Sequence, residues 1–281
     1  MFSDSKSIVF ICLAALLLAA CSNKTQEAAD HAKSGMDKYD KGDLSGALAE
    51  LDQAIAAAPT PQAEYLNDRA LVQLARNDFA TSIADATKAI AINPKLGAAF
   101  GNRALAEQDN GNFTAAIADF TQGIALQPAF APYYGYRGEL LQNQNDFAGA
   151  VADYDKFISL QSSAGPAVRL YRYVLLRRLG RDSGDFASTV ASWSDSWTKN
   201  IGLFLLGKMS EADLLTAAES GPPESGNDRQ CQANYYIGEM HLINKDPAGA
   251  RPFIALASAL EGTNCDEYGF ARTELAHLPK P

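Results

Sequence analysis

A motif of 34 or 35 residues recurs four times along this chain of 281 residues. Each copy contains a turn in which Gly or Asn precedes Asp or Asn, and these turns begin at Gly42, Asn77, Gly111 and Asn145. On both sides of each turn, apolar residues recur three and four apart over about 12 residues, which predicts two amphipathic helices per copy. One pair of short helices cannot bury its apolar face alone, so consecutive copies must stack on one another.

Small and capping residues predict how the two helices of each copy pack. A small residue stands early in each second helix, where a larger side chain would push the helices apart: Ala47, Ser82, Ala116 and Ala150. We expect four residues to cap the second helices, namely Asp43, Asp78, Asn112 and Asp146. The spacing and the small residues resemble the tetratricopeptide repeat (TPR) signature. We therefore predict an all-α fold, an α-α superhelix or TPR solenoid of antiparallel helix hairpins, with a capping C-terminal helix.

The repeat also divides the chain into segments. We assign 1–20 to a lipoprotein signal peptide, 21–27 to a lipid-anchored tether, and 28–164 to four repeats at 28–61, 63–96, 97–130 and 131–164. Residues 165–220 remain helical in pattern but lose the register, so we expect degenerate helical repeats there. A turn and a small residue return at Asp246 and Ala250, which predicts a repeat-like hairpin and a capping helix within 229–281.

The N-terminus resembles an export signal. An apolar run of 13 residues, from Ile8 to Ala20, is too short to span a bilayer but suits the core of a signal peptide. The tetrad Leu18-Ala19-Ala20-Cys21 resembles the bacterial lipobox, whose cysteine is lipidated after cleavage. The alternative is an ordinary signal peptide with a chance cysteine. The resemblance implies a lipid anchor at Cys21, and Ser22 after it favours the periplasmic face of the outer membrane.

Export changes the cysteine count. Cys12 leaves with the signal peptide and lipid occupies Cys21, so Cys231 and Cys265 are the remaining thiols in an oxidising compartment. A disulfide between them is the simplest outcome. Equivalent positions on packed helices lie about 8–10 Å apart, whereas a disulfide needs Cα atoms within about 7 Å. The bond therefore requires the closing helix to depart from the repeat spacing; two free, buried cysteines are the alternative.

Charged residues recur with the repeat. Arginines stand in the first helix at Arg69, Arg103 and Arg137, and aspartates follow 16 residues later at Asp85, Asp119 and Asp153. We interpret them as ion pairs that fix the hairpins; the alternative is an arginine ladder that points at a ligand carboxylate. The first copy has Ser34 and Glu50 at these positions. A further basic cluster, Arg169 to Arg181, is interpreted as a solvated helix face.

The first helices also predict a binding groove on the concave side of the stack. Its candidate residues are Asn67, Leu71 and Leu74, then Asn102, Leu105 and Gln108, then Tyr136, Glu139 and Gln142. This mixture of amide, aromatic and apolar side chains suits an extended peptide or a helix from a partner protein. A solvated groove without a bound segment is the alternative for each of these residues.

Composition and motifs argue against several other functions. The net charge of −9 provides no basic stripe for nucleic acid. The three histidines, His31, His241 and His277, show no metal-ligand spacing, and no phosphate loop, dinucleotide fingerprint or nucleophile motif is present. We therefore expect no enzyme activity, no metal and no cofactor.

Three segments in the second half resemble the NlpI family of outer-membrane TPR lipoproteins: residues 197–201 (WTKNI), 206–211 (LGKMSE) and 235–239 (YYIGE). The resemblance implies a homodimeric scaffold that tethers peptidoglycan hydrolases, and a tail-specific protease, to the outer membrane. The cysteine pair and the lack of a long polar C-terminal tail depart from the family. The alternative is a lipoprotein that assists outer-membrane assembly, secretion or pilus biogenesis, since those systems also use lipidated TPR proteins.

Overall fold

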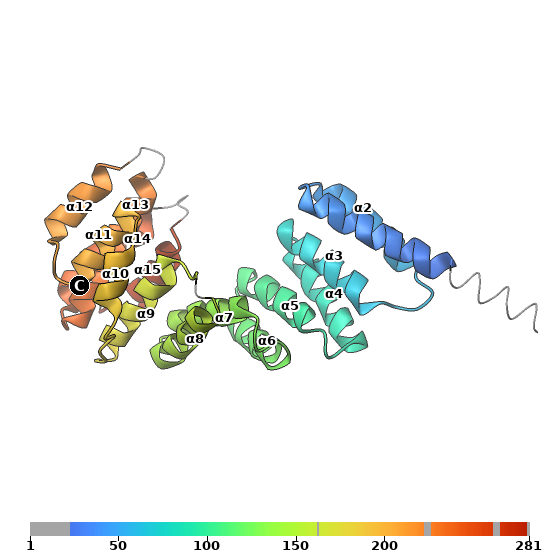
Figure 1. Cartoon of the computed structure of the whole chain (residues 1–281), viewed down its shortest axis with the longest axis horizontal. Coiled ribbons are helices and arrows are strands. Elements are labelled where there is room, and N and C mark those ends of the chain that lie inside the picture. The colour runs from blue at the N-terminus through green and yellow to red at the C-terminus, as the bar shows by residue number, and fades with distance from the viewer. Residues whose placement is uncertain (1–22, 162, 222–225, 261–264, 280–281) are drawn as a thin grey trace, which may run out of the picture. The chain divides into compact units, whose positions relative to one another are not determined.

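The computed structural model describes residues 23–161, 163–221, 226–260 and 265–279, and every regular element within these ranges is a helix (Figure 1). The predicted signal peptide and Cys21 lie outside the described residues. None of the described helices is long and apolar enough to cross a membrane. The chain divides into two compact units, Met1–Ala129 and Phe130–Pro281, here called unit 1 and unit 2.

Unit 1 consists of stacked helical hairpins. After a helix over 23–40 come α2 (Leu44–Ala57), α3 (Ala63–Ala75), α4 (Phe79–Ile92), α5 (Gly97–Asp109) and α6 (Phe113–Leu126). Each of α2 to α5 packs against the helix that follows it, and α3 also packs against α5. The predicted tether is helical from residue 23 onward, where Gln26 donates a hydrogen bond to Asp30 one turn later. This arrangement confirms the predicted all-α fold of stacked hairpins.

The small residues lie at the crossing points of the hairpins. Ala47, Ser82, Ala116 and Ala150 are all completely buried, and the Ser82 hydroxyl donates to the Ala70 carbonyl at 2.8 Å. Ala250 in α14 (Pro247–Ala259) occupies the same position after its turn and is also completely buried. The turns share a left-handed residue between the two helices, as at Asn77 (φ 62°) and Asn145 (φ 61°), which glycine and asparagine adopt at low cost.

The capping prediction is right for two of the four second helices and wrong for the other two. Asp43 and Asp146 accept hydrogen bonds from the backbone N–H groups of Gly46 and Gly149, and Asp246 does the same with Gly249. Asp78 and Asn112 make no side-chain cap bond. The difference lies in the third helical residue. A Cβ atom added at Gly46 would lie 2.1 Å from Asp43 Oδ2, so glycine lets the carboxylate approach; α4 and α6 carry Thr81 and Ala115 there instead.

Unit 2 begins with α7 (Ala131–Asn143) and α8 (Phe147–Leu160), which form a regular hairpin. Within the described residues of this unit, seven more helices follow: α9 (Pro166–Arg178), α10 (Phe186–Ser192), α11 (Ser196–Leu205), α12 (Glu211–Glu219), α13 (Gly226–Ile243), α14 and α15 (Glu267–His277). α13 packs against α9, α11, α12, α14 and α15, and α15 also contacts α7. The result is one continuous core from residue 150 to residue 278, rich in tyrosine and phenylalanine.

The region 165–220 keeps more of the repeat than its sequence pattern indicated. Arg172 in α9 lies 35 residues after Arg137 and pairs with Asp155 of α8. Gly180 (φ 69°) lies 35 residues after Asn145 and has the same left-handed conformation. The register is lost only beyond it, where α10 spans seven residues.

The interpretation of the basic cluster as a solvated face is wrong for one member, Arg178, which is largely buried. Arg172 is partly exposed and pairs with the exposed Asp155. Arg178 donates to Glu239 at 3.0 Å and to Glu274 at 3.1 Å, and its guanidinium lies over the Phe147 ring. Long-range contacts explain the difference, because Glu239 and Glu274 are supplied by α13 and α15.

Cys231 of α13 and Cys265, just before α15, are joined in the structure with their Cα atoms 6.4 Å apart. Both residues are buried. The distance is shorter than the spacing of equivalent positions on packed helices, as the expected bridge requires. Formation of this bond in the exported protein stays a prediction.

Candidate functional site

The periodic arginines form ion pairs within their own hairpins. Two guanidinium nitrogens of each arginine donate to both oxygens of the aspartate 16 residues later. The N–O distances are 2.6 and 3.0 Å for Arg69–Asp85, 2.7 and 2.7 Å for Arg103–Asp119, and 2.8 and 2.7 Å for Arg137–Asp153. Bidentate pairing fixes the geometry as well as adding energy. The ion-pair interpretation is therefore confirmed, and these arginines are engaged with their own hairpins.

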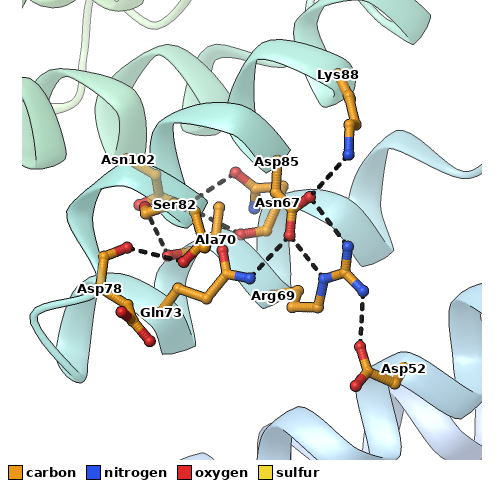
Figure 2. A network of polar contacts seen from close by, with 11 residues as sticks. Asp52, Asn67, Arg69, Ala70, Gln73, Asp78, Ser82, Asp85, Lys88 and Asn102 are labelled. Carbon is orange, nitrogen blue, oxygen red and sulfur yellow. Dashed lines mark hydrogen bonds and ion pairs between the residues drawn. The ribbon is translucent and has the colours of Figure 1, made fainter.

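The same arginines also connect neighbouring repeats. Figure 2 shows Arg69 between Asp85 of its own hairpin and Asp52 of the preceding one, where the N–O distance is 2.6 Å. Gln73 donates to Asp85 at 3.0 Å as well. Arg103 likewise donates a hydrogen bond to the Thr87 hydroxyl of the preceding hairpin at 3.2 Å. Polar contacts thus stabilise both the hairpins and their stacking in unit 1.

The first copy replaces the arginine with a different pair of partners. Glu50 accepts hydrogen bonds from Lys38 and His31, both at 2.7 Å. The hydrogen bond from Lys38, followed by that from His31, lowers the pKa of Glu50 to about 2. The carboxylate therefore stays charged at any physiological pH.

In unit 1, the predicted groove residues divide into two groups. Asn67 is buried, and Asn102 of the next repeat donates to its side-chain oxygen at 2.9 Å, so these amides join two repeats. Leu71, Leu74 and Leu105 remain partly exposed on the first helices, as does Gln108, although its side-chain oxygen is buried without a hydrogen-bond partner. The open part of this surface is therefore mainly apolar.

In unit 2, the C-terminal hairpin changes the predicted groove. Gln142 is buried: its amide nitrogen donates to the Tyr235 hydroxyl at 3.1 Å, and its oxygen accepts from Tyr154 at 3.0 Å. The expectation that Gln142 lines an open groove is wrong, because α13 contributes Tyr235 to this site. Tyr136 and Glu139 remain accessible, with Tyr136 36% exposed.

Tyr136 and Glu139 line a cleft of about 360 Å³, which we call the α7–α9 cleft. Its walls come from α7, α8 and α9 and from Asp266, which precedes α15. Its aromatic lining comes from Tyr136 and Phe157, which are at least partly exposed, and from Tyr154 and Tyr171, which are almost completely buried. Asp266 carries no signal in the sequence, because the fold brings it to α7 from more than 120 positions away.

Two carboxylates face this cleft. Burial, and then the charge of Asp266, raises the pKa of Glu139 to about 7. Burial also raises the pKa of Asp266 itself. Among the described residues neither side chain has a hydrogen-bond or ion-pair partner. The Tyr154 hydroxyl is committed to Gln142, and the Tyr171 hydroxyl donates to Glu267 at 3.2 Å.

The histidines of the described residues make structural contacts and form no metal cluster. No group of three or more His, Cys, Asp and Glu side chains within them is arranged to hold a metal ion. His241 bonds to Asp246 at 2.9 Å and stacks on Phe253, and His31 belongs to the Glu50 cluster. The predicted groove residues that stay accessible lie on two surfaces, the leucines of unit 1 and the α7–α9 cleft of unit 2.

Comparison with known proteins agrees with this fold. Residues 33–96 and 102–181, just over half of the chain, match the family model described as tetratricopeptide repeat. The match extends past Arg172 and Gly180, where the structure also retains the register. None of the curated proteins compared with this chain matches it.

Several solved structures are similar. A tetratricopeptide repeat protein from Parabacteroides merdae aligns over 90% of this chain and 99% of its own, with 17% identity and a TM-score of 0.59. The pilF protein of Pseudomonas aeruginosa aligns over 90% and 99%, with 14% identity and a TM-score of 0.54. MamA aligns over 70% and 97%, with 17% identity and a TM-score of 0.50. At such identities the likeness shows the fold alone.

Proposed function

Because the chain belongs to the tetratricopeptide repeat family, whose fold is in general a non-catalytic scaffold for binding proteins, we propose that it is a lipid-anchored adaptor of the bacterial envelope. In this proposal it holds periplasmic proteins, such as peptidoglycan hydrolases and their protease, at the outer membrane. The observation that carries the binding role is the open surface of the first helices, above all the α7–α9 cleft with Tyr136 and Glu139. A cleft of this size and aromatic character is typical of a binding site.

The anchor and the location rest on the N-terminal sequence. The lipobox-like tetrad places a lipid on Cys21, and two or three acyl chains at about 0.8 kcal/mol per buried CH₂ make the anchor effectively permanent. Cys21→Ala should leave unprocessed precursor and remove labelling by a palmitate analogue. Unchanged labelling would rule out this anchor.

The nature of the partners follows from the resemblance to the NlpI family. A photo-crosslinking amino acid at Tyr136 should capture envelope proteins in living cells, and mass spectrometry should identify them. The control places the same amino acid at Lys156, an exposed residue of α8. Capture of murein hydrolases or proteases supports the adaptor. Capture of porin-assembly, secretin or pilus subunits instead supports the alternative, a lipoprotein that assists outer-membrane assembly, secretion or pilus biogenesis.

Two further parts of the proposal can be tested on purified protein. The resemblance implies a homodimer, which sedimentation analysis of the detergent-solubilised protein would detect. The proposal also excludes turnover of peptidoglycan by the chain itself. Release of muropeptides from purified peptidoglycan would contradict it and show that the protein is an enzyme.

A further inference from the structure

The α7–α9 cleft has walls that suit the stem of a long side chain. Phe157 and Tyr136 border its opening, and the largely buried rings of Tyr154 and Tyr171 close its inner side. The hydroxyls of these inner tyrosines bond to Gln142 and Glu267 and are not available to a ligand. The ring surface that the cleft presents therefore comes mainly from Tyr136 and Phe157, and such surface attracts apolar groups and cations.

Its charged groups are all of one sign. Glu139 and Asp266 are the charged residues that line the cleft, and within the described part of the chain neither has a cationic partner. Glu139 is partly buried, and a carboxylate that is partly withdrawn from water without a hydrogen bond is unfavourable in a folded protein, so it requires an explanation. A structural role would have supplied an internal partner, as Arg178 does for Glu239 in the same unit.

We propose that the α7–α9 cleft binds an arginine side chain presented by a partner protein, which names the partner chemistry of the proposed adaptor and rests on that proposed function. The guanidinium would lie against the aromatic rings and donate to the carboxylates of Glu139 and Asp266, while its methylene stem contacts the apolar wall. Arginine fits better than lysine because its planar group stacks on rings and binds carboxylates through two parallel hydrogen bonds.

Protonation of Glu139 should couple to this binding. The ionisable groups that interact with it are Asp266, Tyr154 of α8 and Tyr171 of α9. Burial raises the pKa of Glu139 to about 7, and none of these neighbours is a cation. A bound guanidinium would favour the charged carboxylate and release its proton, so affinity for arginine should rise between pH 6 and pH 8.

The test uses the full chain, purified from the envelope in detergent, and two fluorescein-labelled peptides. One peptide is Ser-Gly-Leu-Arg-Leu-Gly-Ser; the other has citrulline, a neutral analogue, in place of arginine. Fluorescence anisotropy at pH 8 should show the arginine peptide binding about tenfold more tightly, as a charge-assisted pair implies. The preference should shrink at pH 6.

Variants then separate the cleft from the rest of the surface. Glu139→Gln and Asp266→Asn should each reduce the arginine preference several-fold and leave binding of the citrulline peptide unchanged. Glu219→Gln, at an exposed glutamate at the end of α12 of the same unit, is the matched control and should change nothing. Circular dichroism and the thermal midpoint check that each variant folds. Asp266 is exposed and makes no side-chain cap bond, so its replacement should not harm folding.

Three results would overturn the inference: equal binding of both peptides, no binding of the arginine peptide, or equal effects of Glu139→Gln and Glu219→Gln. A failure of the arginine site can be distinguished from a failure of the adaptor role by crosslinking at Tyr136. If the Tyr136 crosslinker captures envelope proteins and Glu139→Gln does not reduce that capture, the arginine site is wrong and the adaptor stands. If the crosslinker captures nothing, the adaptor itself fails.

Discussion

The two units contain the same repeat but differ in how their hydrophobic cores are built. In unit 1 the core consists of small separate clusters, such as Ala47, Leu51 and Val72, and polar contacts connect one hairpin to the next. In unit 2 a single core of aliphatic residues and many large aromatic ones runs from Ala150 to Leu278. Hydrogen bonds there join residues more than 90 positions apart, as between Gln142 and Tyr235.

This difference teaches where cooperativity comes from in a repeat protein. A stack whose contacts reach only adjacent hairpins responds locally to a change, because each interface is an independent contribution. Unit 2 loses that property once α13 and α15 pack against α7 and α9. We expect changes in unit 1 to stay near their site and changes in unit 2 to spread.

The largest expected effect comes from the centre of unit 2. Phe270 packs edge-on against Tyr171 at 5.2 Å between ring centroids and lies 6.1 Å from Tyr235. Phe270→Ala should cost about 3–5 kcal/mol, because it removes contacts to two other helices as well as its own burial. Hydrogen exchange followed by mass spectrometry should show loss of protection in α9 and α13 as well as α15.

A matched substitution in unit 1 completes this comparison. Leu51→Ala removes a completely buried side chain from α2, and its loss of protection should stay within α2 and α3. If Phe270→Ala affects α15 alone, unit 2 is as modular as unit 1 and the distinction between them is lost.

Sequence predicted the parts of the fold that depend on neighbours within one repeat. The small residue at Ala116 and the Arg103–Asp119 pair act over at most 16 positions, so their spacing alone places them. The capping prediction failed at Asp78, because the cap depends on glycine three residues later and Thr81 stands there.

Only those residues of the candidate site that lie in the first helix of a repeat could be predicted from the sequence. Tyr136 and Glu139 follow from the position of first helices, whereas Asp266 and the burial of Gln142 depend on α13 and α15 folding back. No periodic signal marks such contacts, since they occur once in the chain. Arg172 and Gly180 did carry a signal, the continued spacing of 35 residues, but the absence of a long second helix after them concealed it.

The second prediction concerns the link between Cys231 and Cys265. It closes a loop with a sequence separation of 34, so in the chain-entropy model the bond contributes roughly 3–4 kcal/mol. Cys231→Ala with Cys265→Ala, or reduction of the native protein, should lower the stability of unit 2 and leave exchange in α2 to α5 unchanged. Mass spectrometry of non-reduced protein from the envelope checks the bond itself. Alkylatable thiols at both positions would refute it.

The third prediction tests how tightly the hairpins of unit 1 are packed. Ala116 is completely buried at the crossing of α5 and α6, so Ala116→Leu should overpack the crossing at a cost of roughly 1–3 kcal/mol. Loss of exchange protection should be confined to α5 and α6. Thr114→Leu, at an exposed position of the same helix, is the control. An unchanged thermal midpoint for Ala116→Leu would show that the register of this repeat is misassigned.

The smallest effect, and the sharpest contrast, is the response of each unit to pH. The pKa of Glu50 in unit 1 is lowered to about 2 by Lys38 and His31, so its contribution to stability is present above its usual value of 4.5 and is lost as the pH falls towards 2. The pKa of Glu139 in unit 2 is raised to about 7 by burial. Its neutral form is the one that the fold favours, so stability is present below 4.5 and is lost as the pH rises through 7.

Each glutamate can be replaced with glutamine, and the thermal midpoint of the variant can be compared with that of the parent protein at each pH. The contributions of all other titrating groups are the same in both proteins, so they cancel in the difference between the two midpoints. Glu50→Gln should lower the midpoint at pH 7 and have progressively less effect as the pH approaches 2. Glu139→Gln should raise it at pH 8 and have no effect at pH 4. Water in the cleft screens the Glu139 charge, so this gain should be on the order of 1 kcal/mol, or roughly 2–4 °C. The two midpoint differences should have opposite pH slopes, because the partnered carboxylate of Glu50 is stabilised as an anion. The unpartnered carboxylate of Glu139 is more stable when neutral, unless a cation from another molecule binds it. If the midpoint differences of Glu50→Gln and Glu139→Gln change in the same direction with pH, Glu139 has an internal partner. The α7–α9 cleft then has no unpaired carboxylate at Glu139 to offer to a ligand.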